Sequence, residues 1–301
     1  MSESVARRHD LAHAPLTSPS STTGLLEVFR RRYLLRLLVR REIQARYAGS
    51  AFGLAWSYIN PAIRFATFYV VFGLILGRGL NQENFAIHLF AGMVVVHFFT
   101  ETVTSGTRSL MANKAVVQKM AVPREMFPVA SMLVSLYHTI PQLIILTIVC
   151  LATGWDPDAV GFGAALLGFT LILVLGTALG LLFAATNVLF RDFGRIVQTF
   201  MNMVPFTAPM MYPFELVIGL GERFGDVWPR IYLLNPVAEA VLLIQRGFWV
   251  TTVSNKEEEL QRSFPDDLWS RGFIMLGCCL VVLALGQLVF SRLEKTVPER
   301  L

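Results

Sequence analysis

Charged residues are scarce in this chain. They make up 16% of its 301 residues, and hydrophobic residues make up 54%, whereas about a quarter of an average soluble protein is charged. The charges concentrate in the first fifty residues and in short loops. This distribution excludes an ordinary soluble enzyme and is typical of a polytopic helical membrane protein.

Cysteine is also scarce, and Cys150, Cys278 and Cys279 all fall inside apolar runs. They lack the polar flanks and the spacing of a metal site or a secreted disulfide framework, so we interpret them as core residues and expect no metal. Residues 1–23 are rich in Ser, Thr and Pro and contain no apolar core. This composition favours a disordered cytoplasmic tail over a cleaved signal peptide.

The sequence lacks a nucleotide-binding loop. Such a loop ends in Gly-Lys-Ser or Gly-Lys-Thr so that it can hold phosphates and metal, and no lysine of this chain follows a glycine. The apolar segments also contain no paired carboxylates and no His-Asp motif. We therefore expect neither catalytic residues nor a cofactor here. If ATP drives this protein, ATP and magnesium bind a separate ATPase.

Six segments are candidate transmembrane helices, because a bilayer-spanning helix needs about 20 mostly apolar residues. They cover residues 57–76, 85–103, 127–153, 160–183, 197–211 and 273–291. The fifth is short and contains Pro205 and Pro209, so we expect it to kink or unwind. Small residues on the fourth, Gly176, Gly180 and Ala184, predict close helix packing within the subunit.

Basic residues in the short loops indicate the orientation, because Lys and Arg favour the cytoplasmic side. They follow the second, fourth and sixth segments, whereas the opposite loops carry Glu83, Asp156 and Asp158. Both termini are therefore expected in the cytoplasm. Residues 213–270 form an external segment. Its apolar stretches, 213–220 and 231–250, are expected to be re-entrant or surface helices, with a mobile polar hinge at 251–267.

Residues 25–47 predict an amphipathic interfacial helix. Seven arginines lie opposite a set of apolar side chains that recur at helical spacing. These apolar residues are Leu26, Phe29, Tyr33, Leu37 and Ile43. One interpretation is that the helix only anchors the chain to anionic lipid. The other is that it recognises the phosphate head of a lipid-linked substrate, because Arg forks fit phosphate oxygens. The candidates for that contact are Arg40, Arg41, Arg46 and Tyr47.

Motifs of one known family run along the chain. They are Arg46, Tyr47, Ser50, Gly53, Trp56 and Pro61 in RREIQARYAGSAFGLAWSYINPAIR, then Phe190, Arg191 and Asp192, then Asn235 and Pro236. With these motifs the chain resembles the ABC-2-type permeases of polysaccharide exporters, a class that includes O-antigen, teichoic acid and capsule export. The strongest resemblance is to exporters of O-antigen and, in actinobacteria, of the cell-wall galactan precursor.

Together with the apolar segments, this resemblance implies a fold and an assembly. The fold is an all-α polytopic membrane protein with six transmembrane helices per subunit, the interfacial helix, and an external gate between the fifth and sixth helices. The assembly pairs two copies of the permease with two cytoplasmic ATPase subunits in the bacterial cytoplasmic membrane. The expected domains are a tail at 1–23, the interface helix at 24–50 and the permease domain at 51–301, with its gate at 213–270.

The basic loop at residues 106–124 is the expected contact for that ATPase. The sequence predicts a short basic helix closed by Pro123 on the cytoplasmic side. The alternative is an ordinary loop of the positive-inside kind. The candidate contact residues are Asn113, Lys114, Lys119 and Arg124.

Two charged residues lie inside the expected spans. Arg64 and Glu101 fall at similar depths, because one helix enters while the other returns at about 1.5 Å per residue, and this placement predicts an ion pair. The alternative is that Arg64 extends to the inner interface, since an unpaired charge in hydrocarbon is costly.

Aromatic side chains crowd several spans, and the apolar faces of sugar rings stack on such side chains. We expect about half of them or fewer to touch a cargo. The candidates for lining a glycan pathway are Phe65, Phe68, Tyr69, Phe72, Phe98 and Tyr212.

These observations predict the permease subunit of an ABC transporter that exports a lipid-pyrophosphate-linked polysaccharide. Its expected partners are a second copy, the ATPase, the glycan and membrane lipids, with no nucleic acid. The alternative is an exporter of a small hydrophobic drug or lipid with the same fold, which needs a compact lateral pocket instead of a continuous tube. A membrane enzyme is disfavoured, because it needs acid–base clusters on its active face.

Overall fold

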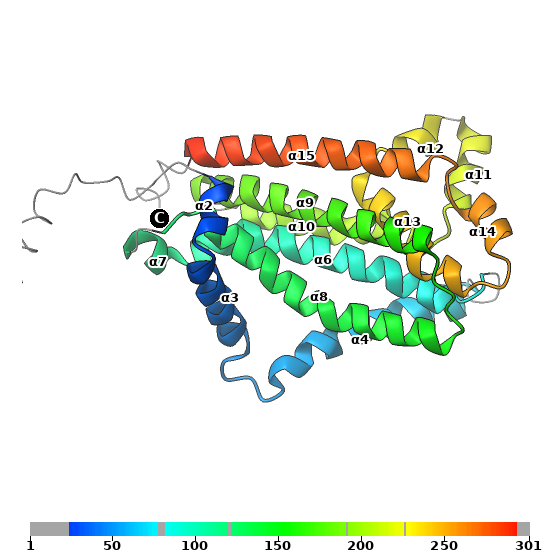
Figure 1. Cartoon of the computed structure of the whole chain (residues 1–301), viewed down its shortest axis with the longest axis horizontal. Coiled ribbons are helices and arrows are strands. Elements are labelled where there is room, and N and C mark those ends of the chain that lie inside the picture. The colour runs from blue at the N-terminus through cyan, green and yellow to red at the C-terminus, as the bar shows by residue number, and fades with distance from the viewer. Residues whose placement is uncertain (1–23, 78–81, 120–121, 191, 226, 294–301) are drawn as a thin grey trace, which may run out of the picture.

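The computed structural model describes residues 24–77, 82–119, 122–190, 192–225 and 227–293, and every regular element within these ranges is helical. Four long helices run side by side along the molecule (Figure 1): α6 (Phe85–Ala112), α8 (Met126–Ala152), α9 (Ala159–Leu189) and α15 (Leu268–Leu293). α9 packs against the other three. The all-α fold expected from the apolar segments is thereby confirmed.

Glycines bring α6 and α9 into close contact. A Cβ on Gly106 would lie 2.9 Å from the Cα of Gly180, and one on Gly176 would lie 3.2 Å from the side chain of Thr102. Only a hydrogen atom fits between the backbones at Gly106, because a Cβ that close to a Cα is not tolerated. The small-residue stripe predicted on the fourth span therefore packs within the subunit, as expected.

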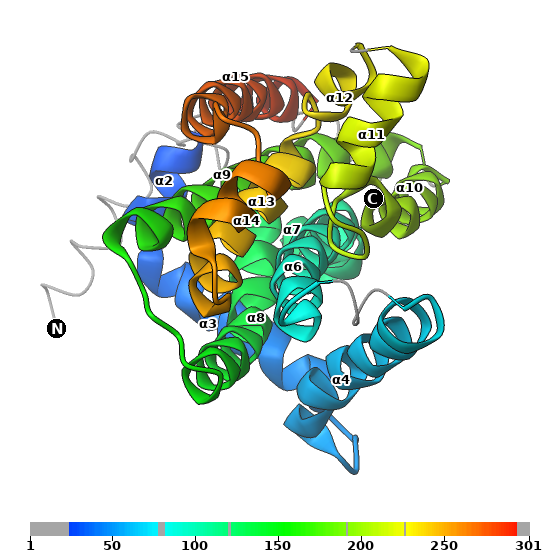
Figure 2. The same cartoon turned by 90° about the vertical axis from the view of Figure 1, so that its right-hand side faces the viewer.

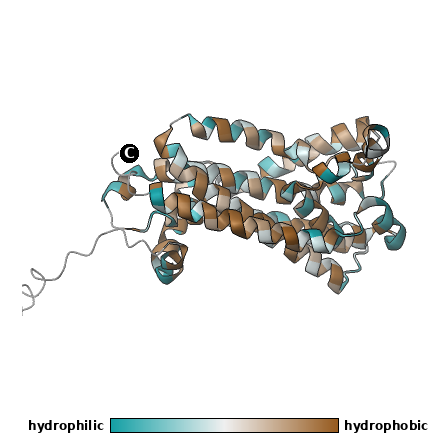
Figure 3. Ribbon diagram, turned by 90° about the horizontal axis from the view of Figure 1, so that it is seen from above, coloured by the Kyte–Doolittle hydropathy of each residue, from teal (hydrophilic) through white to brown (hydrophobic). Residues whose placement is uncertain are grey.

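Five helices in the described ranges are long and apolar enough to cross a membrane. They are α6, α8, α9, α15 and the continuous pair of α4 (Trp56–Phe68) with the π-helical segment η2 (Tyr69–Ile75). α4 follows the short 3-10 turn η1 (Gly53–Ala55) and lies at the periphery of the bundle (Figure 2). Hydrophobic residues run along the bundle and hydrophilic residues gather toward its two ends (Figure 3). The chain is thus a multi-pass membrane protein.

The expected fifth span corresponds to α10 (Phe193–Thr207), a helix of only 15 residues. It ends where Ala208 adopts an extended conformation, with φ −113° and ψ 145°. Ala208 precedes Pro209, and a residue before proline is pushed out of the helical region. The described residues therefore show five candidate spans, and the expected count of six is not confirmed.

After α10, the helices α11 (Glu215–Phe224) and α12 (Val227–Tyr232) lie at one end of the bundle, and α13 (Pro236–Phe248) returns into it. Asn235 is the N-cap of α13, because its side chain accepts a hydrogen bond from the Val237 N–H at 3.0 Å. Pro236 takes the first helical position, where proline is favoured. All residues from Val237 to Gly247 are buried, against α6, α9 and α15. Residues 231–250 were expected to form a re-entrant or a surface helix, and the burial of α13 matches a re-entrant helix.

The expected hinge at 251–267 is largely helical. It contains the end of η3 (Val250–Thr252) and α14 (Lys256–Ser263). The Trp155 indole N–H donates to Thr251 Oγ1 at 2.6 Å, and the Asn84 amide donates to the Thr252 carbonyl at 2.7 Å. These bonds tie the segment to two other loops, and the expected mobility of the hinge stays a prediction.

The opposite end of the bundle carries α2 (Leu25–Arg30), α3 (Arg32–Tyr47) and α7 (Lys114–Lys119), and we call it the α3 end. The predicted interfacial helix is broken at Arg31, with φ −95° and ψ 37°. Leu35 and Leu38 pack inward, whereas the apolar Phe29 and Tyr33 stay exposed, as suits a helix at a lipid interface. Because α6 continues to Ala112, the basic loop predicted at 106–124 begins only at Asn113.

Candidate functional site

The C-terminal end of α3 brings Arg46 against Glu101 of α6. Their guanidinium and carboxylate groups form an ion pair, and the Ser105 hydroxyl donates to the same carboxylate at 3.1 Å. The side chain of Arg46 keeps 39% of its surface exposed and that of Glu101 keeps 28%. The pair is therefore within reach of a ligand.

The position of Arg64 differs from the expectation. The sequence predicted that Arg64 would pair with Glu101, but the guanidinium at Glu101 belongs to Arg46, and the described residues give Arg64 no ion-pair partner. Along α4 only Pro61 is buried. Because this helix lies at the periphery of the bundle, Arg64 remains exposed.

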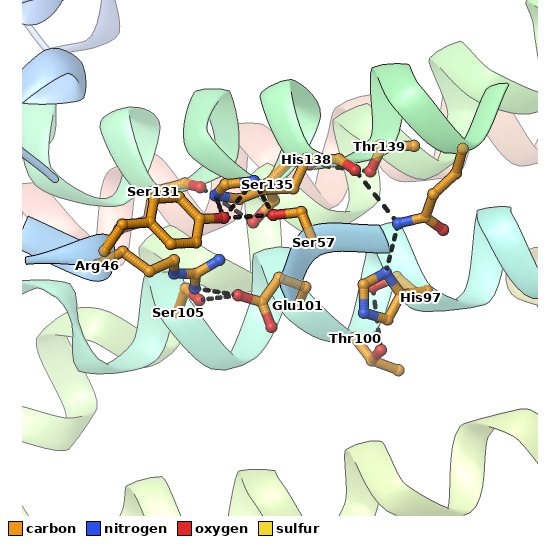
Figure 4. Close-up of polar contacts among 12 residues, drawn as sticks. Arg46, Ser57, His97, Thr100, Glu101, Ser105, Ser131, Ser135, His138 and Thr139 are labelled. Carbon is orange, nitrogen blue, oxygen red and sulfur yellow. Dashed lines mark hydrogen bonds and ion pairs between the residues drawn. The ribbon is translucent and has the colours of Figure 1, made fainter. Parts of the chain in front are cut away.

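Three polar side chains from three helices converge next to this pair. The hydroxyls of Tyr47 on α3 and Ser57 on α4 are in contact, and they lie 3.1 Å and 3.0 Å from Nδ1 of His138 on α8. The rings of Tyr47 and His138 meet edge to face, with centroids 5.6 Å apart. We call these three residues the hydroxyl–imidazole cluster. Figure 4 shows Ser57 and His138 of this cluster beside the Arg46–Glu101 pair.

Gln142 connects this cluster to α6. Its side-chain nitrogen lies 3.2 Å from the His138 carbonyl oxygen and 3.4 Å from Nδ1 of His97. Its side-chain oxygen is buried and has no hydrogen-bond partner among the described residues. A buried amide oxygen without a partner is uncommon and marks a place where a donor from a ligand or water fits.

These side chains line a cavity of about 350 Å3, which we call the polar chamber. It contains the Arg46 guanidinium, two imidazoles and several hydroxyl and amide groups, with Glu101 as its acid. Such a set of groups suits an anionic or hydroxyl-rich ligand. Within the described ranges, no three His, Cys, Asp or Glu side chains gather in a way that could hold a metal ion.

A second polar cavity, of about 330 Å3, lies on the other side of His97 and Glu101. We call it the interior cavity. Its remaining walls come from α4, α6 and α10 and include Arg64, Gln198 and Asn202. His97 and Glu101 line both cavities, so they form the wall between the polar chamber and the interior cavity.

A third cavity, of about 390 Å3, lies between α3 and the end of α6, and we call it the arginine cavity. Arg46 lines it as well as the polar chamber, so the three cavities follow one another from the α3 end. Asn113 donates to Glu42 at 3.0 Å and accepts a long hydrogen bond from Arg41 at 3.5 Å. Burial raises the pKa of Glu42, and the bond from Asn113 opposes this shift.

The predicted phosphate and ATPase contacts are only partly brought together. Arg41, Arg46 and Tyr47 line the arginine cavity or the polar chamber, whereas Arg40 is exposed and lines neither. Asn113 is buried, so it holds α3 against α6 and is unsuited to meet a partner protein.

The other expected ATPase contacts lie at the α3 end. Lys114 and Lys119 are exposed on α7, and Arg124 is half-buried just before α8.

Only some of the predicted aromatic residues line a cavity. Phe98 is 0% exposed and stacks on Phe169 of α9 with centroids 5.2 Å apart, so it belongs to the core and not to a pathway. Phe68 lines the interior cavity together with Phe206. The expectation that about half of these rings or fewer touch a cargo stays a prediction.

The remaining aromatics lie elsewhere. Phe72 meets Phe68 edge to face on the same helical stretch, and the Tyr212 hydroxyl lies 3.1 Å from that of Tyr232. Phe65 stacks with Tyr69 and lines a fourth cavity, of about 310 Å3, which we call the apolar chamber. Its other walls include Tyr58, Pro61, Ala62, Phe90, Gln142 and Leu146.

Sequence reasoning missed Ser57, His138 and Gln142 as site residues. A signal was present, because His138 and Gln142 are four residues apart, as are His97 and Glu101. Residues at this spacing share one helix face. Two polar pairs at one-turn spacing on adjacent spans predict that those faces meet, since polar groups in a membrane turn toward the protein interior.

Known proteins resemble this chain over most of its length. Residues 33–249 match the model of the ABC-2 type transporter family. The O-antigen export system permease protein RfbA of Myxococcus xanthus is 28% identical over 225 residues, which cover 74% of this chain and 83% of that protein. RfbA of Klebsiella pneumoniae is 24% identical over 274 residues, covering 88% and 94%.

A third relative is the polysialic acid transport protein KpsM of Escherichia coli. It is 20% identical over 209 residues, which cover 68% of this chain and 80% of that protein. The family match alone extends over well more than half of the chain, through α3 and all the helices up to α13. This protein belongs to the ABC-2 type transporter family of membrane proteins.

Proposed function

We propose that this chain is the permease subunit of an ABC transporter that exports a lipid-pyrophosphate-linked polysaccharide across the bacterial cytoplasmic membrane. The relatives named as O-antigen export permeases support this function, because they align over 83% and 94% of their own length. The polymer would be of the O-antigen or cell-wall galactan class.

The observation that carries the proposal is the series of polar cavities beside α6. The spans around these cavities are mostly apolar, and polar groups inside a membrane protein are costly and mark functional sites. The series starts at the arginines of α3 and continues to the cavity that Arg64, Gln198 and Asn202 line. A polar polymer with an anionic lipid head requires such groups, whereas an apolar cargo does not.

The proposal includes an assembly with a second copy of the chain and two cytoplasmic ATPase subunits. Both termini face the cytoplasm, so the α3 end and α7 meet the ATPase. The helices α11, α12 and α14 then lie at the external mouth and gate it. The ATPase partner supplies the nucleotide chemistry, and this chain has no catalytic role of its own.

Depletion of the protein in its host tests this function. Lipid-linked glycans are then analysed on each face of the cytoplasmic membrane, and we expect completed polymer to accumulate on the cytoplasmic face. A normal glycan distribution would contradict the proposal.

A second candidate function is export of a small hydrophobic drug or lipid. The apolar chamber favours it, because it is a compact cavity with mostly hydrocarbon walls. In the same depletion experiment, this candidate predicts a changed sensitivity to small hydrophobic compounds with no change in surface glycan.

A further inference from the structure

A fifth cavity, of about 320 Å3, lies at the end of the bundle opposite the α3 end, and we call it the α11–α14 pocket. Its walls come from three segments far apart in the sequence: the loop before α6, the start of α11 and the second half of α14. It shares no lining residue with the four cavities described above. Its volume falls within the range of small-molecule sites, about 300–1,000 Å3.

Gln82 is the residue of this pocket that points most directly to a ligand. Its side-chain nitrogen and oxygen are both buried, and neither has a hydrogen-bond partner among the described residues. The backbone beside it is fixed, since Glu83 accepts bonds from the Ser254 hydroxyl at 2.7 Å and from the Trp249 indole N–H at 2.9 Å. Unpaired buried polar atoms are costly. An amide held in this way donates to and accepts from a hydroxyl-bearing ligand.

The charged groups of the pocket favour a neutral ligand. Glu215 at the start of α11 forms an ion pair with Arg262 of α14, and Glu259 accepts a hydrogen bond from the Ser263 hydroxyl. Two acids and one base therefore leave the lining with an excess of one negative charge. Like charges brought together in a binding site are unfavourable, so this excess disfavours an anionic ligand.

The pocket also has an apolar side, which Pro213 and Leu216 supply. A sugar ring combines hydroxyl groups with an apolar C–H face. Carboxylates accept bonds from such hydroxyls, and an amide or a guanidinium donates to their oxygens. The lining of the α11–α14 pocket offers all of these contacts to a single ring.

We propose that the α11–α14 pocket binds a neutral sugar unit of the glycan as the chain leaves the protein. Gln82, Glu259 and Arg262 bond to the hydroxyls of the unit. Pro213 and Leu216 contact its C–H face. This inference rests on the proposed function, which places α11 and α14 at the external mouth. A unit held there bridges the two helices and cannot slip back into the pathway.

Saturation-transfer NMR on the full-length protein in lipid nanodiscs tests the site, because this method detects weak sugar binding. The probe is a galactose trisaccharide. Gln82→Leu removes both unpartnered atoms and keeps a side chain of similar size, so we expect it to weaken the probe about fivefold or more. Gln261→Leu is the matched control, because Gln261 is exposed on α14 and does not line the pocket. It should leave the affinity unchanged.

The thermal midpoint of the same variant separates a binding role from a structural one. Without sugar, the Gln82 amide makes no hydrogen bond to the described residues. Gln82→Leu should therefore keep or raise the midpoint while it weakens binding. A lower midpoint would show that the amide supports the fold and would contradict its role as a ligand contact.

A second probe, a sialic acid trisaccharide with one carboxylate per unit, tests the charge preference. We expect the wild-type protein to bind the galactose probe at least about fivefold more tightly than this one. Glu259→Gln removes the excess negative charge and should reduce the preference to about twofold. Glu258→Gln should keep it, because Glu258 is exposed on the same helix and does not line the pocket. Equal binding of both probes to the wild-type protein would overturn the preference.

ATP-dependent export of a neutral lipid-linked polymer into proteoliposomes then identifies the source of the sugar. We expect slower export in Gln82→Leu and normal export in Gln261→Leu. Weaker probe binding with unchanged export would assign the pocket to a glycan already outside, contrary to the inference. Normal export without any probe binding would contradict the inference alone. Intact probe binding without any export would contradict the proposed function.

Discussion

Glu239 is a buried carboxyl that no sequence motif singled out. It lies on α13, outside the five candidate spans, and neither of its carboxylate oxygens has a hydrogen-bond partner among the described residues. Burial raises its pKa to about 8, while Arg271 lowers the pKa and Asp267 raises it by smaller amounts. The folded protein therefore holds this carboxyl mainly in its protonated form at neutral pH.

This shift predicts that stability falls as pH rises. The unfolded chain loses the Glu239 proton near the ordinary pKa of 4.5, whereas the folded protein keeps it up to about 8. Below the lower pKa, Glu239 is protonated in both the folded and the unfolded state, so it does not reduce the free energy of unfolding. Between the two pKa values, the free energy of unfolding falls by at most about 1.4 kcal/mol per pH unit. Above the higher pKa, this loss of stability stays constant.

The measurement is the thermal unfolding midpoint of the detergent-solubilised protein as a function of pH. We expect the midpoint of the wild-type protein to fall between about pH 5 and about pH 8. Glu239→Gln keeps the shape of the side chain without the charge, so it should remove most of that slope. Parallel slopes in the two proteins would contradict a buried, protonated Glu239.

The arginines predicted to meet a phosphate should not be equivalent. Arg46 lines the polar chamber, whereas Arg40 is exposed outside it. Loss of a hydrogen bond to a charged group costs about 1.5–3 kcal/mol, which is tenfold or more in affinity. We expect Arg46→Ala to raise the isoprenyl diphosphate concentration that half-maximally stimulates the partner ATPase by at least about tenfold, and Arg40→Ala by less than about threefold. Equal effects would favour the interpretation that α3 only anchors the chain to lipid.

At the residue scale, sequence reasoning identified the charges but not all their partners. Arg46 and Glu101 were both named, yet Glu101 was assigned to Arg64 because depth along two ideal spans was the only available measure. The direction in which α4 leaves the bundle decides that contact, and this direction depends on packing between segments far apart in sequence. A helical period describes one helix and contains no such information.

At the element scale, the contact between α6 and α9 depends on Gly106. Because a Cβ there would lie 2.9 Å from the Cα of Gly180, Gly106→Ala should push the two helices apart and cost about 1–3 kcal/mol. The control is Gly277→Ala on α15, where a Cβ meets nothing within 4 Å. We expect a lower thermal midpoint for Gly106→Ala and an unchanged or slightly higher one for the control. The same midpoint in both variants would show that the close approach is not required.

Element boundaries followed hydropathy only in part. α6 continues nine residues beyond the apolar run that ends at Val103, because its polar groups are satisfied inside the helix. The hydroxyl of Thr107 bonds to the Val103 carbonyl at 2.6 Å, and that of Ser109 bonds to the Gly106 carbonyl at 2.7 Å. Hydropathy counts such residues against a membrane span, whereas packing against α9 keeps them in the helix and the local bonds satisfy their hydroxyls.

At the scale of the whole molecule, α7 is expected to couple the permease to its ATPase. Lys114 and Lys119 are exposed on this helix at the α3 end, so Lys114→Gln with Lys119→Gln should lower co-purification of the ATPase. Lys256→Gln is the control, because Lys256 pairs with Asp156 at the other end. Equal recovery of the ATPase with all variants would contradict the assigned contact.

The global architecture was more predictable than the site. Long apolar segments predict membrane helices because each must satisfy its own backbone in lipid, and five of the six expected segments became candidate spans. The return of α13 into the bundle depends on contacts with α6, α9 and α15. Its register in the core, which buries Glu239, comes from those contacts and not from any local pattern.

The most direct test of the central claim is transport in proteoliposomes that contain the permease and its ATPase. A lipid-linked polysaccharide is supplied on the ATPase side, and its protection from an added glycosidase is measured with and without ATP. We expect protection that requires ATP and that is lost in Arg46→Ala. Absence of protection, together with ATP-dependent movement of a small hydrophobic dye, would contradict polysaccharide export and favour the small-molecule exporter.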